Sequence, residues 1–218
     1  MPLHKPDDRA RYETRREGGI GMEILIVSGF LGSGKTSLIV PLAKDLIATA
    51  GRRIAIIEND YGRVSADAKL INSSGLAVKE ICAGCICCSL GPSLLKTLQE
   101  LESSVGPDLI IIEPSGLANP DSIISTLRMH QPSVARISTI VLLDSSRFAA
   151  MMPAFDIPLR NQVAAADLLV VNKIDKTDAR ALGQVQQWLS LNFPHKASLL
   201  SSRADRASLD EIRRRLWT

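Results

Sequence analysis

The stretch MEILIVSGFLGSGKTSLIV, residues 22–40, joins a short apolar run, a glycine-rich loop and the start of a helical pattern. Residues 22–28 are rich in β-branched and other apolar side chains, which predicts a buried strand. The loop GFLGSGKT, residues 29–36, fits G-x-x-x-x-G-K-[ST] at each fixed position. Helical spacing then runs from Thr36 to about Ala50. A strand, this loop and a helix in that order predict a phosphate-binding loop.

The residue types of this loop suit a nucleotide. Glycines let backbone N–H groups close around phosphate oxygens, and the helix N-terminus adds partial positive charge. We expect Lys35 to reach the β- and γ-phosphates and the Thr36 hydroxyl to bind Mg²⁺. The alternative is a glycine-rich turn that ends in an exposed lysine. We assign nucleotide binding to Gly29, Gly32, Ser33, Gly34, Lys35, Thr36 and Ser37.

Further apolar runs predict strands at residues 52–59, 75–81, 108–113, 135–144, 167–173 and 196–202. Helical patterns separate several of these runs, and they include residues 94–103, with Pro92 at the first helical position, and residues 209–217. Strands that alternate with helices predict an α/β, doubly wound fold of the P-loop NTPase class. Its sheet should be mostly parallel, with helices on both faces. Ligands of such sheets bind at the carboxyl ends of the strands.

Composition narrows the possible partners. The chain has 218 residues, a formal net charge of +3 and only 4% aromatic residues, which argues against a nucleic-acid partner. No apolar run reaches the roughly 18 residues that a membrane span needs. Residues 1–21 are polar and charge-mixed, so we expect a flexible N-terminal extension and no signal peptide. The remaining residues, 22–218, should form one domain, and we expect a cytoplasmic protein without a membrane partner.

The tetrapeptide NKID, residues 172–175, follows the apolar strand at 167–173. The carboxylate of Asp175 can accept hydrogen bonds from N1–H and the N2 amino group of guanine. Adenine lacks that donor pair and would leave a buried acceptor unpaired, which is costly. The stem of Lys173 can lie along the purine. With the phosphate loop upstream, Asn172, Lys173 and Asp175 predict GTP over ATP, whereas Ser201 and Ser202 could line the guanine pocket or simply end a strand.

The predicted strand at residues 108–113 ends in a carboxylate, and a glycine follows shortly after it. Glu113 stands where P-loop enzymes usually place an aspartate for Mg²⁺, and Gly116 follows it by three residues. A mobile glycine at this position senses the γ-phosphate in such enzymes. We therefore predict that Thr36 and Glu113 hold Mg²⁺; a helix-capping or solvent-exposed carboxylate is the alternative for Glu113. ENDYG, residues 58–62, ends another strand, and Asp60 is a candidate to orient the attacking water or a structural turn residue.

All four cysteines lie between positions 82 and 88, too close together to form a disulfide framework. Thiolates at this density suit Zn²⁺, Cu(I) or similar ions. In extended backbone Cys85 and Cys87 would share a face, and Cys88 could join them only if the chain turned. Cys82 could be a fourth ligand or a small buried hydrophobic residue. A redox role is the alternative for the group as a whole.

The complete set of motifs resembles the CobW-type GTPases, relatives of the nickel-insertion GTPases of urease and hydrogenase. The resemblance covers about residues 22–218 and rests on five motifs in order: GFLGSGKT, ENDYG, GCICC, IIEPSGLANP and QVAAADLLVVNKID. It implies that residues 22–218 are a P-loop GTPase domain without the C-terminal domain and the His-rich segment of many members. It also implies Glu58, Cys87 and Cys88 as nucleotide-sensitive metal ligands, with Cys85 in support.

The resemblance implies a metallochaperone that uses GTP/GDP, Mg²⁺ and a transition metal, Zn²⁺ or Co²⁺. Hydrolysis would be coupled to delivery of the metal to a client metalloprotein, and a GTP-dependent homodimer is a possible assembly. Intrinsic turnover should be slow, because no arginine finger is evident beside the motifs. Two alternatives stay open: a zinc- or redox-sensing GTP-binding regulatory module without metal delivery, and a P-loop kinase that acts on a small molecule.

Overall fold

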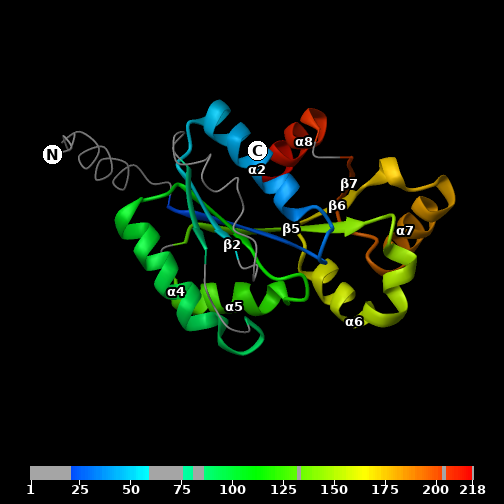
Figure 1. The fold of residues 1–218 in the computed structure, drawn as a ribbon, viewed down its shortest axis with the longest axis horizontal. Helices are drawn as coiled ribbons and strands as arrows, with labels where there is room; N and C mark the ends of the chain where they lie inside the picture. Colours follow the sequence, from blue (N-terminus) through cyan, green and yellow to red (C-terminus); the bar gives the residue numbers. More distant parts are fainter. Residues whose placement is uncertain (1–20, 59–75, 81–85, 132–133, 203–204, 218) are drawn as a thin grey trace.

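The structure is a computed structural model, and it describes residues 21–58, 76–80, 86–131, 134–202 and 205–217. Within these ranges the strands form one seven-stranded sheet in the order β3-β2-β4-β1-β5-β6-β7, and each neighbouring pair is parallel (Figure 1). The strands are β1 (Glu23–Gly29), β2 (Ile54–Glu58), β3 (Leu76–Glu80), β4 (Leu109–Glu113), β5 (Arg136–Asp144), β6 (Leu168–Asn172) and β7 (Ser198–Leu200). The doubly wound α/β prediction is confirmed.

Helices cover both faces of this sheet. They are α2 (Lys35–Ala50), α4 (Ile86–Ser104), α5 (Pro120–His130), α6 (Phe148–Ala165), α7 (Ala179–Asn192) and α8 (Arg206–Trp217), with a short 3₁₀ turn η1 (Ile174–Lys176) after β6. Helices α2 and α8 lie on one face, and α4, α5 and α6 lie on the other (Figure 1). The central strand β1 runs between the two layers, so its carboxyl end and the loop after it lie in the middle of the sheet edge.

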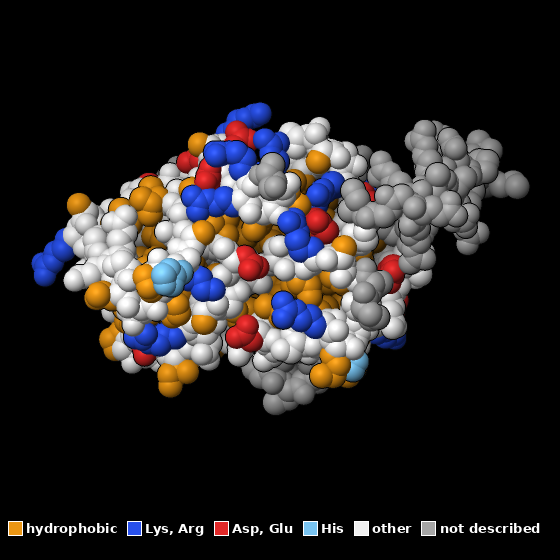
Figure 2. Space-filling model, turned by 180° about the vertical axis from the view of Figure 1, so that it is seen from behind, with side chains coloured by type: hydrophobic (Ala, Val, Ile, Leu, Met, Phe, Trp, Pro, Cys, Tyr) orange, Lys and Arg blue, Asp and Glu red, His pale blue; other side chains and the backbone are white. Residues whose placement is uncertain are grey.

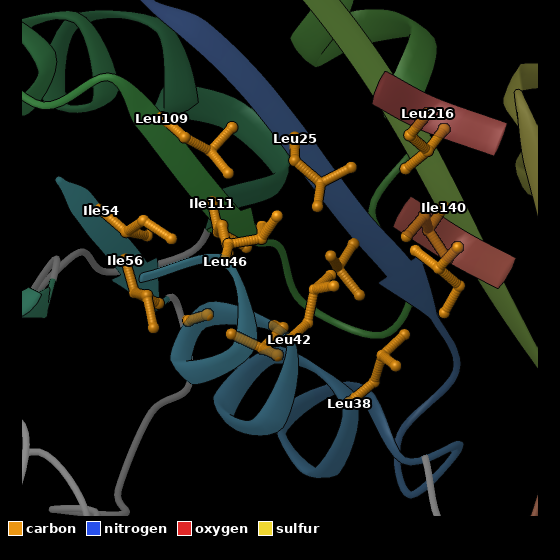
Figure 3. Close-up of a cluster of buried hydrophobic side chains, with 14 of the residues drawn as sticks. Leu25, Leu38, Leu42, Leu46, Ile54, Ile56, Leu109, Ile111, Ile140 and Leu216 are labelled. Carbon is orange, nitrogen blue, oxygen red and sulfur yellow. The ribbon is translucent and has the colours of Figure 1, made fainter. Parts of the chain in front are cut away.

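Alternation along β1 explains why both layers form. Leu25 and Val27 pack with α2 and α8, whereas Ile24 and Ile26 pack with α4 and α5, and all four side chains are buried. Successive side chains of a strand point to opposite faces, so an unbroken apolar run requires cover on both. Figure 3 shows Leu38, Leu42 and Leu46 of α2 meeting the apolar side chains of β1, β2 and β4. The apolar contacts therefore anchor the start of α2 under the loop at residues 29–36.

Helix α4 differs from its prediction. It begins at Ile86, six residues before Pro92, so the placement of Pro92 at the first helical position is wrong. A proline inside a helix removes one backbone hydrogen bond, to the carbonyl four residues earlier, and here that loss lies close to the N-terminus. Cys87 and Cys88 consequently lie in the first turn of α4, where the extended geometry considered for Cys85 and Cys87 does not apply. Cys85 lies outside the described residues.

The end of the C-terminal helix α8 is attached at the amino end of β1, whereas the motifs lie at the carboxyl ends of the strands. Trp217 donates from Nε1 to Oε2 of Glu23 at 2.7 Å, and Arg52 donates to the same oxygen at 2.6 Å. The guanidinium of Arg52 lies 5.3 Å from the centroid of the Trp217 ring, in the geometry of a cation–π contact. Glu23 begins β1, so this cluster links the first strand with the last helix.

The described surface mixes charges of both signs. Figure 2 shows Lys and Arg side chains spread singly over one face among acidic and apolar ones, which accords with the small net charge. Among the described helices, none combines the length and the apolar composition that a bilayer span requires.

Candidate functional site

The loop between β1 and α2 needs its glycines for space and for backbone conformation. Gly29 and Gly34 have φ angles of 139° and 103°, a region that L-residues with a side chain rarely adopt. A Cβ at Gly29 would lie 2.5 Å from the carbonyl oxygen of Leu142, and one at Gly34 would lie 2.5 Å from Nδ2 of Asn172. The loop is therefore packed directly on the ends of β5 and β6, and a side chain at either position would displace it.

Lys35 and Thr36 stand at the start of α2, as the motif predicts. Lys35 is buried; its Nζ donates to the Gly29 carbonyl at 3.1 Å and lies 3.8 Å from Oε1 of Glu113. The Thr36 hydroxyl lies 3.2 and 3.1 Å from the two carboxylate oxygens of the same glutamate. Glu113 ends β4 and is itself buried. The structure thus brings together the ammonium, hydroxyl and carboxylate that the sequence predicts.

The base-side motif reaches the same loop from β6. Asn172 is buried and its Nδ2 donates to the Ser33 carbonyl at 2.9 Å, while Lys173 donates to the Gly32 carbonyl. Lys173 adopts a left-handed conformation with φ of 63°, which turns the chain into η1, and Asp175 is exposed within η1. A small hollow between the motifs is lined by Gly34, Ser37, Leu38, Leu142, Val170, Asn172 and Ser201. Ser201, one of the two predicted serines, is a lining residue.

An aspartate at the end of β5 connects these loops, and the sequence analysis missed it. The carboxylate of Asp144 is buried and accepts hydrogen bonds at 2.8 Å from Lys173 Nζ and from Arg147 Nε. Arg147 also donates to the carbonyl of Leu31. Arg147 therefore stands beside the motifs, where its guanidinium binds Asp144 and a loop carbonyl; the expectation that no arginine finger serves the site stays a prediction. The available signal was an acidic residue at the carboxyl end of a predicted strand.

The pKa of Asp144 follows from this environment. Burial alone would raise the pKa, but hydrogen bonds from Lys173, Ser146 and Arg147 together outweigh burial and hold the pKa below the ordinary aspartate value of 3.8. An unfolded chain would bind this proton at higher pH than the folded chain does. The contribution of Asp144 to stability is therefore complete above pH 3.8 and is lost as the pH falls through the folded value.

Replacing Asp144 by asparagine should remove this pH dependence. We expect the variant to be less stable than the wild type by about 1–3 kcal/mol near neutral pH, because two cations lose their buried anion. The difference in unfolding free energy should shrink as the pH drops below 3.8. Urea unfolding of both proteins between pH 3 and pH 7 measures this difference; a gap that does not change with pH would show that Asp144 is not ionised in the folded protein.

The loop after β4 lies against the phosphate-binding loop. A Cβ at Gly116 would lie 2.6 Å from the backbone nitrogen of Leu31, so this predicted γ-phosphate sensor touches the loop at residues 29–36. Gln162 of α6 donates to the carbonyls of Gly116 and Ala118. Gln162 begins the motif QVAAADLLVVNKID, but its contact with the loop at Gly116 becomes visible only in the folded chain.

The predicted transition-metal ligands are only partly described. Glu58 ends β2 and stands in register with Glu113 of β4. Cys87 and Cys88 are in α4, and the placement of their side chains is outside what the structure describes; Cys85 and Asp60 lie outside the described residues altogether. Among the described residues, no group of three or more His, Cys, Asp or Glu side chains could hold a metal ion. The proposed cysteine ligands therefore stay predictions.

A family model decides the relationship of this chain to known proteins. Residues 23–200 match the CobW/HypB/UreG nucleotide-binding domain. The chain belongs to this family. The resemblance drawn from the motifs is thereby confirmed, and the match covers the sheet from β1 to β7 and the motifs between them.

Curated relatives of the CobW/HypB/UreG family carry names of zinc chaperones. The chain is 34% identical to the zinc chaperone YeiR of Escherichia coli, over 77% of this chain and 51% of the relative. It is 30% identical to the zinc chaperone CobW of Pseudomonas aeruginosa, over 92% of this chain and 64% of the relative. The chain thus spans about half to two thirds of the length of these relatives.

Solved structures of the family share the fold. HypB from Helicobacter pylori in complex with nickel aligns with a TM-score of 0.60 at 21% identity, over 95% of this chain and 91% of that one. The Zn(II)-bound YjiA GTPase from E. coli aligns with a TM-score of 0.59 at 25% identity, over 83% and 57% of the two chains. At these identities the HypB comparison establishes the architecture only.

Proposed function

We propose that this chain binds GTP with Mg²⁺, hydrolyses it to GDP and phosphate, and couples the cycle to the transfer of a transition metal to a client protein. The observation that carries the nucleotide part is the convergence of three motifs on one loop. The Glu113 carboxylate lies beside the Lys35 ammonium and the Thr36 hydroxyl. Asn172 donates to the Ser33 carbonyl, and Gly29 and Gly34 are packed so closely that a side chain would not fit. Membership of a nucleotide-binding domain family supports the same proposal.

Mg²⁺ fits the residues that the motif assigns to it. Mg²⁺ prefers oxygen ligands. The protein usually supplies only one or two of them, and water and substrate phosphates complete the coordination shell. The Thr36 hydroxyl and the Glu113 carboxylate supply such oxygens within hydrogen-bonding distance of each other. When bound there, Mg²⁺ would neutralise the negative charge of the phosphates. Lys35, buried beside Glu113, would add its positive charge to the same phosphates.

The transition metal is the cargo in this proposal, with Glu58, Cys85, Cys87 and Cys88 as its ligands and Zn²⁺ or Co²⁺ as the ion. Strand register supports a link between cargo and nucleotide. Adjacent strands lie about 4.8 Å apart, so Glu58 and Glu113 are neighbours at the carboxyl ends of β2 and β4. A shift of the Mg²⁺-side carboxylate on hydrolysis would therefore act directly beside the proposed cargo ligand. The names of the relatives, which are zinc chaperones, support zinc as cargo.

The proposed client is a metalloprotein that accepts the ion from the thiolates of this chain.

We include a GTP-dependent homodimer in the proposal. Leu31 and Leu117 are 71% and 58% exposed, and they belong to the two loops that meet at the phosphate site. Apolar side chains exposed beside the nucleotide suit a partner that covers it.

Reciprocal linkage tests the coupled function. If a non-hydrolysable GTP analogue tightens Zn²⁺ or Co²⁺ binding by some factor, the metal must tighten binding of the analogue by the same factor. Fluorescence titration of the analogue with and without metal measures one arm, and competition for the metal with a chromophoric chelator, with and without the analogue, measures the other. An unchanged nucleotide affinity across the metal titration would contradict coupling. Release of free phosphate, with no phosphorylated acceptor, separates a GTPase from a small-molecule kinase.

Serine substitutions test the cargo ligands. We expect Cys87→Ser and Cys88→Ser each to weaken Zn²⁺ binding about a hundredfold, close to 3 kcal/mol, because a hydroxyl is a poor substitute for a thiolate ligand. Competition with a chromophoric chelator gives the affinities, which should also rise with pH as thiols lose their protons. Cys82→Ser serves as the matched control. Equal losses in all three variants would add Cys82 to the ligand set, and no loss in any would contradict the assignment.

A further inference from the structure

Gln162 is a buried glutamine in the last turn of α6, and it begins the segment that leads into the guanine motif at residues 172–175. Its side chain is 1% exposed, and Nε2 donates to the carbonyl of Gly116 at 3.0 Å and to that of Ala118 at 3.2 Å. Its Oε1 is buried and has no hydrogen-bond partner among the described residues. The amide therefore uses both donors on one loop and leaves its acceptor unsatisfied, which is an uncommon arrangement for a side chain that serves only to fill the core.

The loop that Gln162 holds is the one that begins at Glu113 and ends at the N-terminus of α5. At its start Glu113 contacts Thr36, and at its end Asn119 caps α5 by accepting from the N–H of Asp121 at 3.1 Å. Gly116 stands between these two fixed ends. Its backbone is so close to Leu31 that a methyl group would overlap the peptide. Gln162 thus binds the middle of the loop on the side of α6, and the phosphate-binding loop contacts it at Gly116.

Helix α6 is also in contact with the phosphate-binding loop. The ring of Phe155 lies 5.4 Å from that of Phe30, and Arg147, immediately before the helix, donates to the carbonyl of Leu31. Phe155 departs from helical geometry, with φ of −132°, so the helix is bent at this contact. Because the same helix contacts both loops, it can fix the position of Gly116 relative to the nucleotide phosphates.

We propose that Gln162 is a positioning residue that orients the Gly116–Ala118 peptides for recognition of the third phosphate. This inference rests on the proposed function, in which Gly116 senses the γ-phosphate. With two carbonyls bound to the glutamine amide, the peptide planes of this loop have fixed orientations before nucleotide arrives. Such preorganisation improves binding of the state that the loop must recognise, while a diphosphate, which does not reach the loop, gains nothing.

The test compares Gln162→Leu with Gln131→Leu. Gln131 is a second buried glutamine, 7% exposed, at the end of α5, and its Nε2 has no hydrogen-bond partner among the described residues. For Gln162→Leu we expect affinity for a non-hydrolysable GTP analogue to fall about tenfold while GDP affinity changes less than about twofold. Gln131→Leu should change neither. Gln162→Asn, which keeps an amide but shortens its reach, should show the same selective loss.

Hydrogen exchange provides a readout that does not depend on GTP chemistry. In nucleotide-free protein, the peptide that covers residues 113–119 should exchange faster in Gln162→Leu than in the wild type, with peptides from β1 and α2 unchanged. Equal losses of GTP-analogue and GDP affinity, or an unchanged exchange rate in this peptide, would overturn the positioning role. A wild-type protein that does not bind GTP would contradict the proposed function instead, and the exchange comparison would still decide the role of Gln162.

Discussion

Replacing Lys35 by alanine is expected to lower the affinity for nucleoside triphosphate about a hundredfold and to reduce hydrolysis by a further factor of about 10²–10³. Lys35 is a buried cation at the N-terminus of α2, and its ammonium group lies beside Glu113 and the Gly29 carbonyl. Alanine would leave the developing negative charge of the phosphates without this partner. Release of free phosphate from GTP and fluorescence titration measure the two effects.

Lys44→Ala is the matched control for this substitution. Lys44 stands on the same helix but is exposed, so its removal should leave both nucleotide affinity and turnover within about twofold of the wild type, as is usual for surface substitutions. The Lys35→Ala variant also separates the remaining alternatives. If metal delivery to a client continues without hydrolysis, GTP hydrolysis does not drive the delivery. Unimpaired hydrolysis would show that the phosphate site lies elsewhere.

Replacing Asp175 by asparagine should exchange the preferred base. A carboxylate accepts from both N1–H and the N2 amino group of guanine, whereas an asparagine amide places one donor opposite the amino group. We expect GTP affinity to fall about a hundredfold, because the hydrogen bond to the amino group is lost and the acceptor for N1–H is no longer charged. Xanthine carries a carbonyl where guanine carries the amino group, so XTP affinity should rise in the same variant. Displacement of a fluorescent nucleotide by GTP, XTP and ATP gives all three values.

Asp178→Asn provides the control for the base exchange. Asp178 follows by three residues and its carboxylate caps α7 by accepting from the N–H of Ala181 at 2.7 Å, a bond that asparagine can also accept. This variant should keep the preference for GTP. If Asp175→Asn loses GTP without gaining XTP, the carboxylate supports the turn η1 and does not read the base. If ATP competes as well as GTP in the wild type, the guanine assignment is wrong.

Much of the fold follows from local patterns. Continuous apolar runs such as residues 108–113 predict strands buried on both faces, and the structure places β4 there with all five residues buried. Lys35, Thr36 and Glu113 could be paired from sequence because each stands at the carboxyl end of a strand or in the turn after it, and such ends meet at one edge of a parallel sheet. The start of α4 was not predictable in this way, since Gly91 and Pro92 resemble a helix boundary.

The contacts that connect the loops were beyond local patterns. Gln162 begins the motif that leads into residues 172–175, but only the packing of the folded chain brings its amide to two carbonyls of the loop at Gly116. Asp144 ends a predicted strand and Arg147 follows it by three residues, but its other partner, Lys173, comes from the loop after β6. The register that makes Glu58 the neighbour of Glu113 depends on the strand order, which places β4 between β1 and β2.

The amino-acid sequence by itself determined that this chain is an α/β nucleotide-binding domain of the CobW type, because its chemistry-bearing motifs are contiguous and each fits a turn after a strand. The tertiary structure alone decided how these turns support one another: Asp144 between Lys173 and Arg147, Gly116 against Leu31, and Gln162 beneath the loop that follows Glu113. The physical reason is distance along the chain. Hydrogen bonds between residues dozens of positions apart depend on sheet order and helix packing, and no local pattern of residues records either.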